Sequence, residues 1–452
     1  MTTLSKQDDS VSRQTQSDKE AIKLPFNACL GWGIGSIATM TVLNVTNGLL
    51  LKYFVDHLAI AAYFAGLIIA GSRIFDAFID IFVGMFSDKT KSPWGRRRPY
   101  LLVGSFLLAL SPIILFAVPL LVSPEYMTLM IFFGLAMYAI SYTVFNVPYM
   151  AMPVEMTQNH HERTYLFSFR IYGTAVGTLL GGAMAPWLIT YFGGGSIGFA
   201  KMSFVVALIV LVVGLTCFWT TRNAPKFEYK ESKEKAKFFN LGKVLANRPF
   251  LFLLLAKIFI VASTGVGAAA MAFIVTDVLQ QSLAWIGIYA MSATAGMLVS
   301  QPFWLKISKA HSKRICFFIA ASLFILVTLT WLLTGPEETK FLLGLRGFCL
   351  GLTGGGVLLA TQAMLPDVLE HDFKINGIRH EGAMTGMYTT VERGASALGV
   401  ALAGVVLSAG GYIGGVDPTA EGIRAIYACV AIIPCFGLLL SILAITQYRL
   451  KG

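Results

Sequence analysis

Residues 60 to 88 form an apolar stretch with three charged side chains, Arg73, Asp76 and Asp80, near its middle. At spacings of three and four residues, these side chains share one face of a helix. The stretch is long enough to cross a bilayer, where a central charge costs roughly 2.5 to 3.5 kcal/mol on insertion scales. One arginine cannot neutralise two carboxylates, so the surplus acid needs a cation or a proton. The pattern predicts a cation-binding site inside a membrane; the alternative is a salt bridge that merely orients the helix.

The loop that follows, SDKTKSPWGRRRPY at residues 87 to 100, places five basic residues at the end of this stretch. Membrane topology and attraction to anionic lipids are one explanation for such a run. The other is a cytoplasmic gate, in which the loop holds neighbouring helix ends together in one conformation. The candidate gate residues are Asp88, Arg96, Arg97 and Arg98.

The composition excludes a soluble protein. The 452 residues are 56% hydrophobic, and their mean hydropathy is +0.69. A net charge of +11 would suggest a nucleic-acid partner in a soluble protein, but here it reflects the orientation signal of a membrane protein. The six cysteines lie in or beside apolar runs without CxxC spacing, which is typical of packing residues. We therefore expect no nucleic-acid partner, no cofactor and no metal site.

Apolar runs predict an all-α membrane protein with twelve transmembrane helices. Placing both termini in the cytoplasm puts 26 of the 35 lysines and arginines on that side and 4 outside, a bias that sets the orientation. The predicted helices are 27–52, 60–87, 100–121, 126–150, 165–192, 199–221, 249–276, 284–306, 313–334, 341–363, 383–410 and 422–447.

A long charged linker divides the chain into two halves of six helices. An internal repeat supports this division: Asp56 and Ser87 are 31 residues apart, and so are Asp277 and Ser308. Such repeats are typical of transporters with a midplane cavity. The predicted parts are a disordered cytoplasmic tail at 1–24, a six-helix half at 25–221, a cytoplasmic linker at 222–248, a second half at 249–447 and a cytoplasmic tail at 448–452.

The repeat is not symmetric in its charges. Carried over without gaps, the three charged residues of the first half correspond to Thr294, Met297 and Gln301 in the second. A purely architectural acid pair would have been useful in both halves. Its presence in one half favours a specific task there.

Several motifs together resemble one family. RIFDAFID with SDKTKSPWGRRRPY, SYTVFNVPY, FSFRIYG around Arg170, and residues 367–396 resemble the glycoside–pentoside–hexuronide:cation symporters, which have the major facilitator fold. The resemblance covers both halves of the chain. It implies cation-coupled import of a small molecule by alternating access. We expect a monomer in the lipid of a membrane, with the bacterial cytoplasmic (inner) membrane as its location.

The resemblance also implies a cation site. The family's two helix-2 aspartates match Asp76 and Asp80, and its helix-4 threonine matches Thr143. An asparagine that often precedes the second aspartate is Ile79 here. A hard cation wants several oxygen ligands, whereas two neighbouring carboxylates can share a proton. Of the two coupling ions, H⁺ is therefore favoured over Na⁺.

The sugar site departs further from the family. Where the family has a galactoside clamp of aspartates and a tryptophan, this chain has Met40, Asn146 and Met150. The helix-5 arginine is kept as Arg170, and a helix-11 lysine becomes an arginine. Guanidinium groups bind carboxylate, sulfate or phosphate through paired donors, which suits an anionic solute. The candidate substrate residues are Tyr142, Asn146, Arg170, Tyr388, Thr389 and Arg393.

Two further residues are expected to pair charges at this site, Arg73 and Glu392. Arg73 and Arg170 would orient the carboxylates or take over their charge when the cation leaves. For Arg170, a strut to Asp76, Asp80 or Glu392 is as reasonable as a direct contact with the solute.

The function predicted from the sequence is a cation-coupled symporter of a glycoside or a related small, anionic organic solute. The alternative is a symporter of amphipathic lipids such as lysolipids, which fits the apolar pocket. No HExxH motif is present, and the one GxSxG match, residues 194–198, follows a predicted transmembrane helix rather than a strand, so a membrane enzyme is not expected. A passive channel would have no use for the two aspartates.

Overall fold

The computed structural model describes residues 24–157, 160–225, 247–376 and 381–448. Most of the predicted terminal tails and of the predicted linker lies outside these residues. Throughout the described parts, helices are the regular secondary structure, and each predicted apolar range falls mainly in helix. Most ends are shifted by a few residues, but the helix predicted at 341–363 extends to Asn376.

The first group of helices is α2 (Phe26–Asp56), α3 (Ala62–Lys89), α4 (Arg98–Phe116), η1 (Val118–Leu121), η2 (Pro124–Tyr126), α5 (Met127–Met156), α6 (His160–Leu179), η3 (Leu180–Met184), α7 (Ala185–Tyr191) and α8 (Gly195–Thr221). These helices pack mainly against one another, and we call them the N-terminal bundle.

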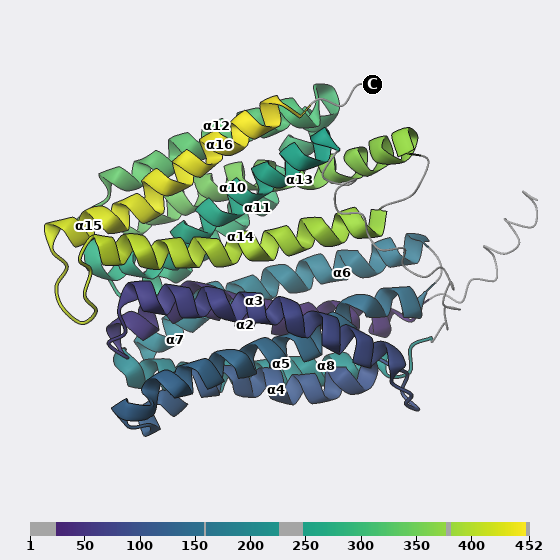
Figure 1. The fold of residues 1–452 in the computed structure, drawn as a ribbon, viewed down its shortest axis with the longest axis horizontal. Helices are drawn as coiled ribbons and strands as arrows, with labels where there is room; N and C mark the ends of the chain where they lie inside the picture. The colour runs from purple at the N-terminus through teal and green to yellow at the C-terminus, as the bar shows by residue number, and fades with distance from the viewer. Residues whose placement is uncertain (1–23, 158–159, 226–246, 377–380, 449–452) are drawn as a thin grey trace, which may run out of the picture.

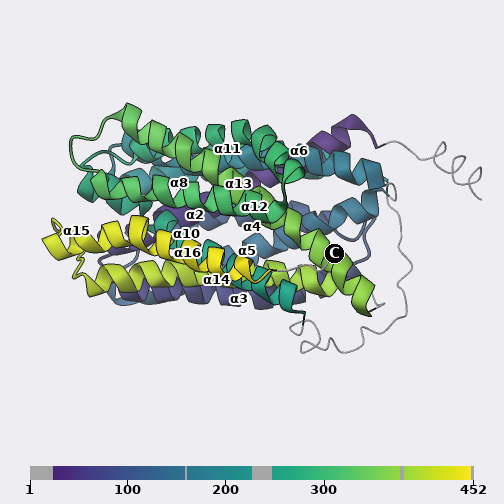
Figure 2. The same cartoon turned by 90° about the horizontal axis from the view of Figure 1, so that it is seen from above.

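The second group, the C-terminal bundle, also packs mainly within itself. Figure 1 shows its green-to-yellow helices beside the purple-to-teal ones of the N-terminal bundle, and Figure 2 shows the same helices running along one axis. Its members are α10 (Arg248–Phe273), η4 (Ile274–Val278), α11 (Ala284–Ala310), α12 (Lys313–Leu329), η5 (Thr330–Leu333), α13 (Lys340–Asn376), α14 (Glu381–Ala409), α15 (Ala420–Tyr427), η6 (Ala428–Ile432) and α16 (Ile433–Thr446).

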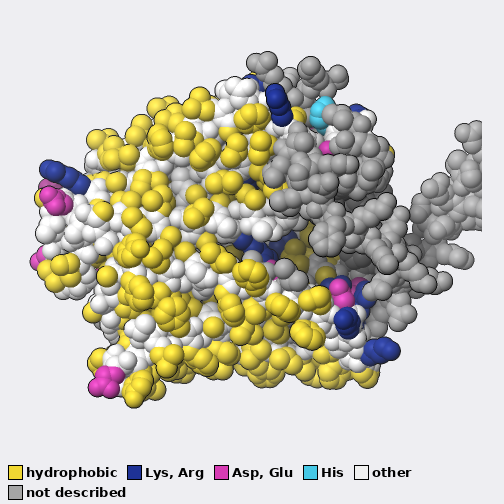
Figure 3. Space-filling view, in the orientation of Figure 1, with side chains coloured by type: hydrophobic (Ala, Val, Ile, Leu, Met, Phe, Trp, Pro, Cys, Tyr) yellow, Lys and Arg dark blue, Asp and Glu magenta, His cyan; other side chains and the backbone are white. Residues whose placement is uncertain are grey.

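The outside of the molecule is apolar, as expected for a protein in lipid. Figure 3 shows hydrophobic side chains over most of one face, with basic and acidic groups gathered near the two ends and in a central recess. Among the described residues, nine helices are long and apolar enough to cross a membrane, by length and composition. Because about 20 residues span the hydrocarbon, the protein is an integral, multi-pass membrane protein.

Local sequence explains where several helices begin. Asn247 precedes α10 and accepts a hydrogen bond from the backbone N–H of Phe250, and Ser312 precedes α12 and accepts one from Ile315. Such N-caps satisfy N–H groups that the helix itself leaves without a partner. Proline in the first turn of α4 and of α10 adds a fixed φ without removing a helical hydrogen bond.

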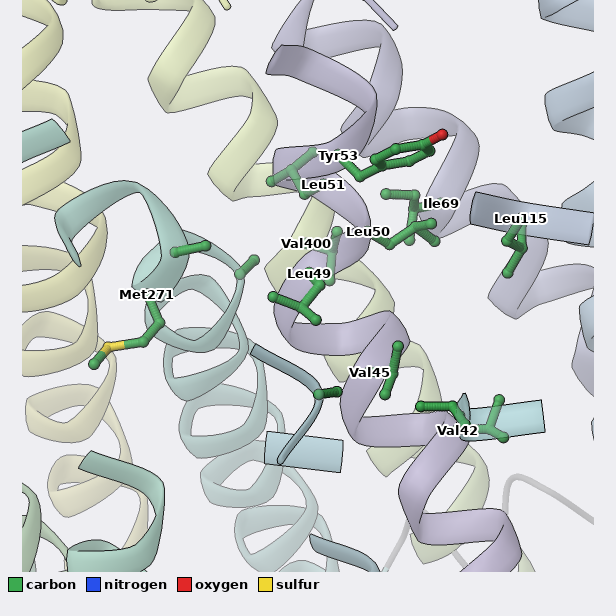
Figure 4. Packing of buried hydrophobic residues seen from close by; sticks show 14 of the residues in the cluster. Val42, Val45, Leu49, Leu50, Leu51, Tyr53, Ile69, Leu115, Met271 and Val400 are labelled. Atoms are coloured by element: carbon green, nitrogen blue, oxygen red, sulfur yellow. The ribbon is translucent and has the colours of Figure 1, made fainter. Parts of the chain in front are cut away.

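The two bundles meet closely at one end of the molecule. A Cβ added at Gly404 of α14 would lie 2.3 Å from the carbonyl oxygen of Ala62, and one added at Gly287 of α11 would lie 3.0 Å from that of Ala183. Glycine permits these approaches because it has no side chain. Figure 4 shows buried hydrophobic side chains from both bundles, with Leu49 of α2 near Val400 of α14.

Candidate functional site

The two aspartates of α3 meet a threonine of α5. The Thr143 hydroxyl lies 2.7 Å from Oδ1 of Asp76 and 2.9 Å from Oδ1 of Asp80. All three side chains lie where α3 packs against α5, and Asp76 and Thr143 are buried. The structure thus brings together the three residues predicted to hold the coupling cation.

Asp80 has a further partner from the other bundle. Its Oδ2 forms an ion pair with the guanidinium of Arg393 on α14, a helix that packs along α3. The sequence predicted Arg73, on the same helix, and Arg170 as the basic partners of the acids. Arg393 changes that balance, because it compensates one carboxylate from a position more than 300 residues away in the chain.

The Arg73 guanidinium does not form an ion pair with Asp76 or Asp80 among the described contacts. Its guanidinium donates to the Tyr138 hydroxyl at 3.0 Å and to Oδ1 of Asn47 at 2.6 Å, and it lies over the Tyr138 ring. The expected contact with the acids is therefore made by Arg393 instead. Sequence reasoning missed Asn47 and Tyr138, because each is one of several polar side chains in its helix and nothing local singles it out.

The predicted substrate residues of the N-terminal bundle border the cation site. Tyr142 and Asn146 lie one turn apart on α5, next to Thr143, and both are buried. Arg170 comes from α6, and its Nε is buried without a hydrogen-bond partner among the described residues. A buried guanidinium N–H without an acceptor is costly, so a ligand that supplies one would gain affinity.

The predicted residues of α14 divide into two kinds. Tyr388 is buried, and Thr389 is exposed with its hydroxyl bonded to the Gly386 carbonyl. Glu392 forms an ion pair with Lys257 of α10 at 3.1 Å, and Lys257 lies over the Tyr388 ring at 4.9 Å. Tyr388 thus supports a charged pair rather than facing open space.

The predicted gate residues form a network around a residue that the sequence did not single out. Glu155, near the end of α5, accepts from Arg96 at 2.6 Å and also from Arg97. Arg97 pairs with Asp88 at 2.8 Å. Arg98 is buried and donates instead to backbone carbonyls beyond the end of α8. All these contacts stay within the N-terminal bundle.

A second charged network joins the bundles at the opposite end, and we call it the Lys52 network. Lys52 lies 2.7 Å from Oδ2 of Asp56 and 2.7 Å from Oδ2 of Asp277, with 4% of its side chain exposed. The Tyr412 hydroxyl contacts both carboxylates, at 3.1 and 2.7 Å. The internal repeat had paired Asp56 with Asp277 in sequence, but nothing in it indicated that they meet.

Comparison with known proteins decides the family. A family model described as MFS/sugar transport protein matches residues 31–452. The chain belongs to this transporter family. It is 27% identical to an uncharacterised symporter of Bacillus subtilis, over 93% of this chain and 91% of that one. It is 24% identical to a glucuronide carrier protein homolog of Escherichia coli, over 95% and 93%.

Solved structures agree on the fold of this transporter. An inward-facing, unoccupied bacterial homolog of the human lysosomal transporter Spinster superposes with a TM-score of 0.67 at 16% identity, covering 93% of this chain and 96% of that one. The relatives are transporters, which supports the resemblance to the glycoside–pentoside–hexuronide:cation symporters. The chain is therefore a transporter of a small molecule, and not an enzyme.

Proposed function

We propose that this transporter is a proton-coupled symporter that imports an anionic sugar derivative, such as a hexuronide, by alternating access. The two bundles would rock about a central site in twelve spans, with both termini in the cytoplasm of a bacterium. H⁺ would load at the acid pair Asp76 and Asp80, with Asp76 as the acid that carries it, and the solute would bind beside them.

The contacts of Thr143 support a proton over sodium. A hydroxyl has one hydrogen to donate, and an ionised carboxylate can only accept. Thr143 nevertheless lies within hydrogen-bond distance of both Asp76 and Asp80. Both contacts become full hydrogen bonds when one carboxyl carries a proton and donates it to Thr143. Asp80 is held ionised by Arg393, so Asp76 is the acid that carries the proton.

The same geometry supports coupling to an anionic solute. Without its proton, Asp76 would add a second negative charge beside Asp80 and draw the Arg393 guanidinium away from the solute. With the proton in place, Arg393 faces one carboxylate and keeps donors for the solute's acidic group. Arg170 offers further N–H groups. The glucuronide carrier homolog among the relatives is named for an anionic sugar of this kind.

The contacts between the bundles at one end of the molecule support alternating access. The Lys52 network and the glycine contacts join the bundles at one end. In the proposed topology this is the outer end, so the central site opens toward the cytoplasm. Loading both ligands would remove the charge imbalance that makes closure of a half-filled site costly.

Asp76→Asn tests the coupling. The amide imitates the protonated acid, so the variant should exchange labelled solute across proteoliposomes while failing to accumulate it against a gradient. Asp80→Asn should lose accumulation too, and Arg393 then lacks its partner. Accumulation retained by both variants, at normal levels in the membrane, would refute the assignment of the coupling site.

The coupling ion has its own test. When solute is added to de-energised cells in a weakly buffered, sodium-free medium, the medium should become more alkaline. Ile79→Asn is the matched variant, because it restores an amide oxygen beside Asp80 and should create stimulation by sodium. A wild-type signal that requires added sodium would reverse the choice of ion. Uptake of a labelled lysolipid instead of a hexuronide in the same vesicles would select the lipid alternative.

A further inference from the structure

Among the described residues, the C-terminal bundle contains two ion pairs in which the cation is buried, and the two pairs differ in exposure. In the pair Arg346–Glu338, both side chains are sealed, at 6% and 3% exposed. In the pair Lys257–Glu392, the lysine is 4% exposed and the glutamate is 42% exposed. Sealing both charges costs desolvation and leaves neither charge open to a further ligand, as in Arg346–Glu338. The second pair instead keeps its acid open while its cation is held behind it.

The open pair borders the proposed site. Glu392 precedes Arg393 on α14, and Arg393 reaches Asp80 on α3. Helix α14 packs against both α10, which carries Lys257, and α3. Figure 3 shows basic and acidic groups in a recess on the face where α14 and α3 lie side by side in Figure 1. The C-terminal bundle therefore brings two cations, on two helices, to the region of the cation site.

Lys257 has donors to spare. An ammonium group carries three N–H bonds. The Lys257 Nζ forms an ion pair with Oε1 of Glu392 at 3.1 Å, and the Tyr388 ring centroid lies 4.9 Å from the charge. The Tyr388 hydroxyl lies near Thr361 without making a hydrogen bond of normal geometry. A buried ammonium with one carboxylate oxygen and a ring as partners can accept a second oxygen ligand at little cost.

We propose that Lys257 is a specificity residue for the charge of the solute. This inference rests on the proposed function and extends it: the solute's carboxylate or sulfonate binds between Lys257 and Arg393, using the ammonium donors that Glu392 leaves free. Glu392 holds the lysine in place while the site is empty. Neutral glycosides bind to the remaining groups and gain nothing from Lys257.

The test compares two solutes that differ in one acidic group, methyl β-D-glucuronide and methyl β-D-glucoside. The double variant Lys257→Met/Glu392→Gln removes both charges without leaving one unpaired. The ratio of glucuronide to glucoside uptake should fall about tenfold, the usual scale for one charge-assisted contact. Lys257→Arg should keep the ratio within about twofold of wild type, since it preserves the charge.

Arg346→Met/Glu338→Gln is the matched control, because it neutralises the sealed pair in the same bundle. It should lower the uptake of both solutes equally or of neither. If the Lys257 double variant also lowers both solutes equally, or leaves their ratio unchanged, Lys257 only braces the bundle and the proposal is overturned. Solute-induced alkalinisation should persist in this variant, so the result is separate from the Asp76 and Asp80 tests of coupling.

Discussion

Charged networks serve different purposes at the two ends of this transporter. At one end, the Lys52 network links α2 of the N-terminal bundle to η4 and to Tyr412 of the C-terminal bundle. At the other end, each ion pair between described residues joins elements of the same bundle, as Arg96–Glu155 and Lys313–Asp367 do. Contacts that cross the bundles stabilise one conformation, whereas contacts within a bundle stabilise all conformations equally.

The second end shows the same arrangement twice. Arg98, at the start of α4, donates to the carbonyls of Arg222 and Ala224 beyond α8. Arg314, at the start of α12, donates to the carbonyl of Thr446 at the end of α16. Each bundle thus uses an arginine to satisfy carbonyls at a helix C-terminus. In the proposed rocking motion, these internal contacts would hold each bundle together as a unit.

Lys52→Met should have the largest effect, because it removes the cation that joins the two bundles in the Lys52 network. It leaves Asp56 and Asp277 facing each other without a cation, and losing one partner of a buried ion pair costs roughly 3 to 5 kcal/mol. The closed end should open. A cysteine at Ser282, which lines a cavity of about 420 Å³ beside Lys52, should then react faster with an impermeant maleimide. Accumulation of solute should fall at least about tenfold.

Lys52→Met/Asp277→Asn is the companion variant, because it removes the cation together with one of its acids. It should recover part of the closed population. An unchanged rate of labelling in Lys52→Met would show that the charges do not hold this end closed.

Gly404→Ala should act in the same direction through packing. The added Cβ would lie 2.3 Å from the Ala62 carbonyl oxygen, closer than real Cβ atoms come, so α14 and α3 must separate. Overpacking of this kind costs about 1 to 3 kcal/mol. Maleimide labelling at Ser282 should rise, though less than for Lys52→Met. Gly386→Ala is the control on the same helix, since a Cβ there meets nothing within 4 Å.

Glu155→Gln should lower the stability of the protein without changing which end of the molecule is closed. The substitution removes the carboxylate that Arg96 and Arg97 share in partly exposed contacts, at about 1 to 2 kcal/mol. The melting temperature in detergent should fall by a few degrees, while labelling at Ser282 stays at the wild-type rate. A faster rate of labelling would mean that this network also biases the conformation.

Asp367→Asn should have the smallest effect. The Lys313–Asp367 pair is 36% and 37% exposed, and pairs of this kind contribute about 0 to 1 kcal/mol. Neither labelling at Ser282 nor accumulation should change, and the melting temperature should drop by at most a degree or two. A large loss of transport here would contradict the view that contacts within a bundle are neutral toward the conformational change.

The helices of this protein could be predicted because the bilayer imposes a local rule. Backbone groups in hydrocarbon must bond within their own segment, so each apolar run of sufficient length becomes a helix. Helical periodicity likewise placed Asp76 and Asp80 on one face of α3. The match of the motifs to a symporter family added Thr143, which the structure places against both acids.

Partners across helices could not be read from the sequence. Which faces of two helices meet depends on side-chain packing over their whole length, and a rotation of one helix changes every pair. Arg73 stands one turn from Asp76, yet it contacts Tyr138 and Asn47. Glu155 gave no local sign that two arginines would share it.

The sequence by itself determined the class of protein, its helices and the acid pair in α3, because these depend on composition and on spacing within one helix. Tertiary structure alone decided how the charges are compensated. Arg393 reaches Asp80, and Lys52 joins Asp56 to Asp277, only after the two bundles pack together. The physical reason is the long range of Coulomb interactions in a medium of low dielectric constant: they depend on distance in space, which separation along the chain does not reveal.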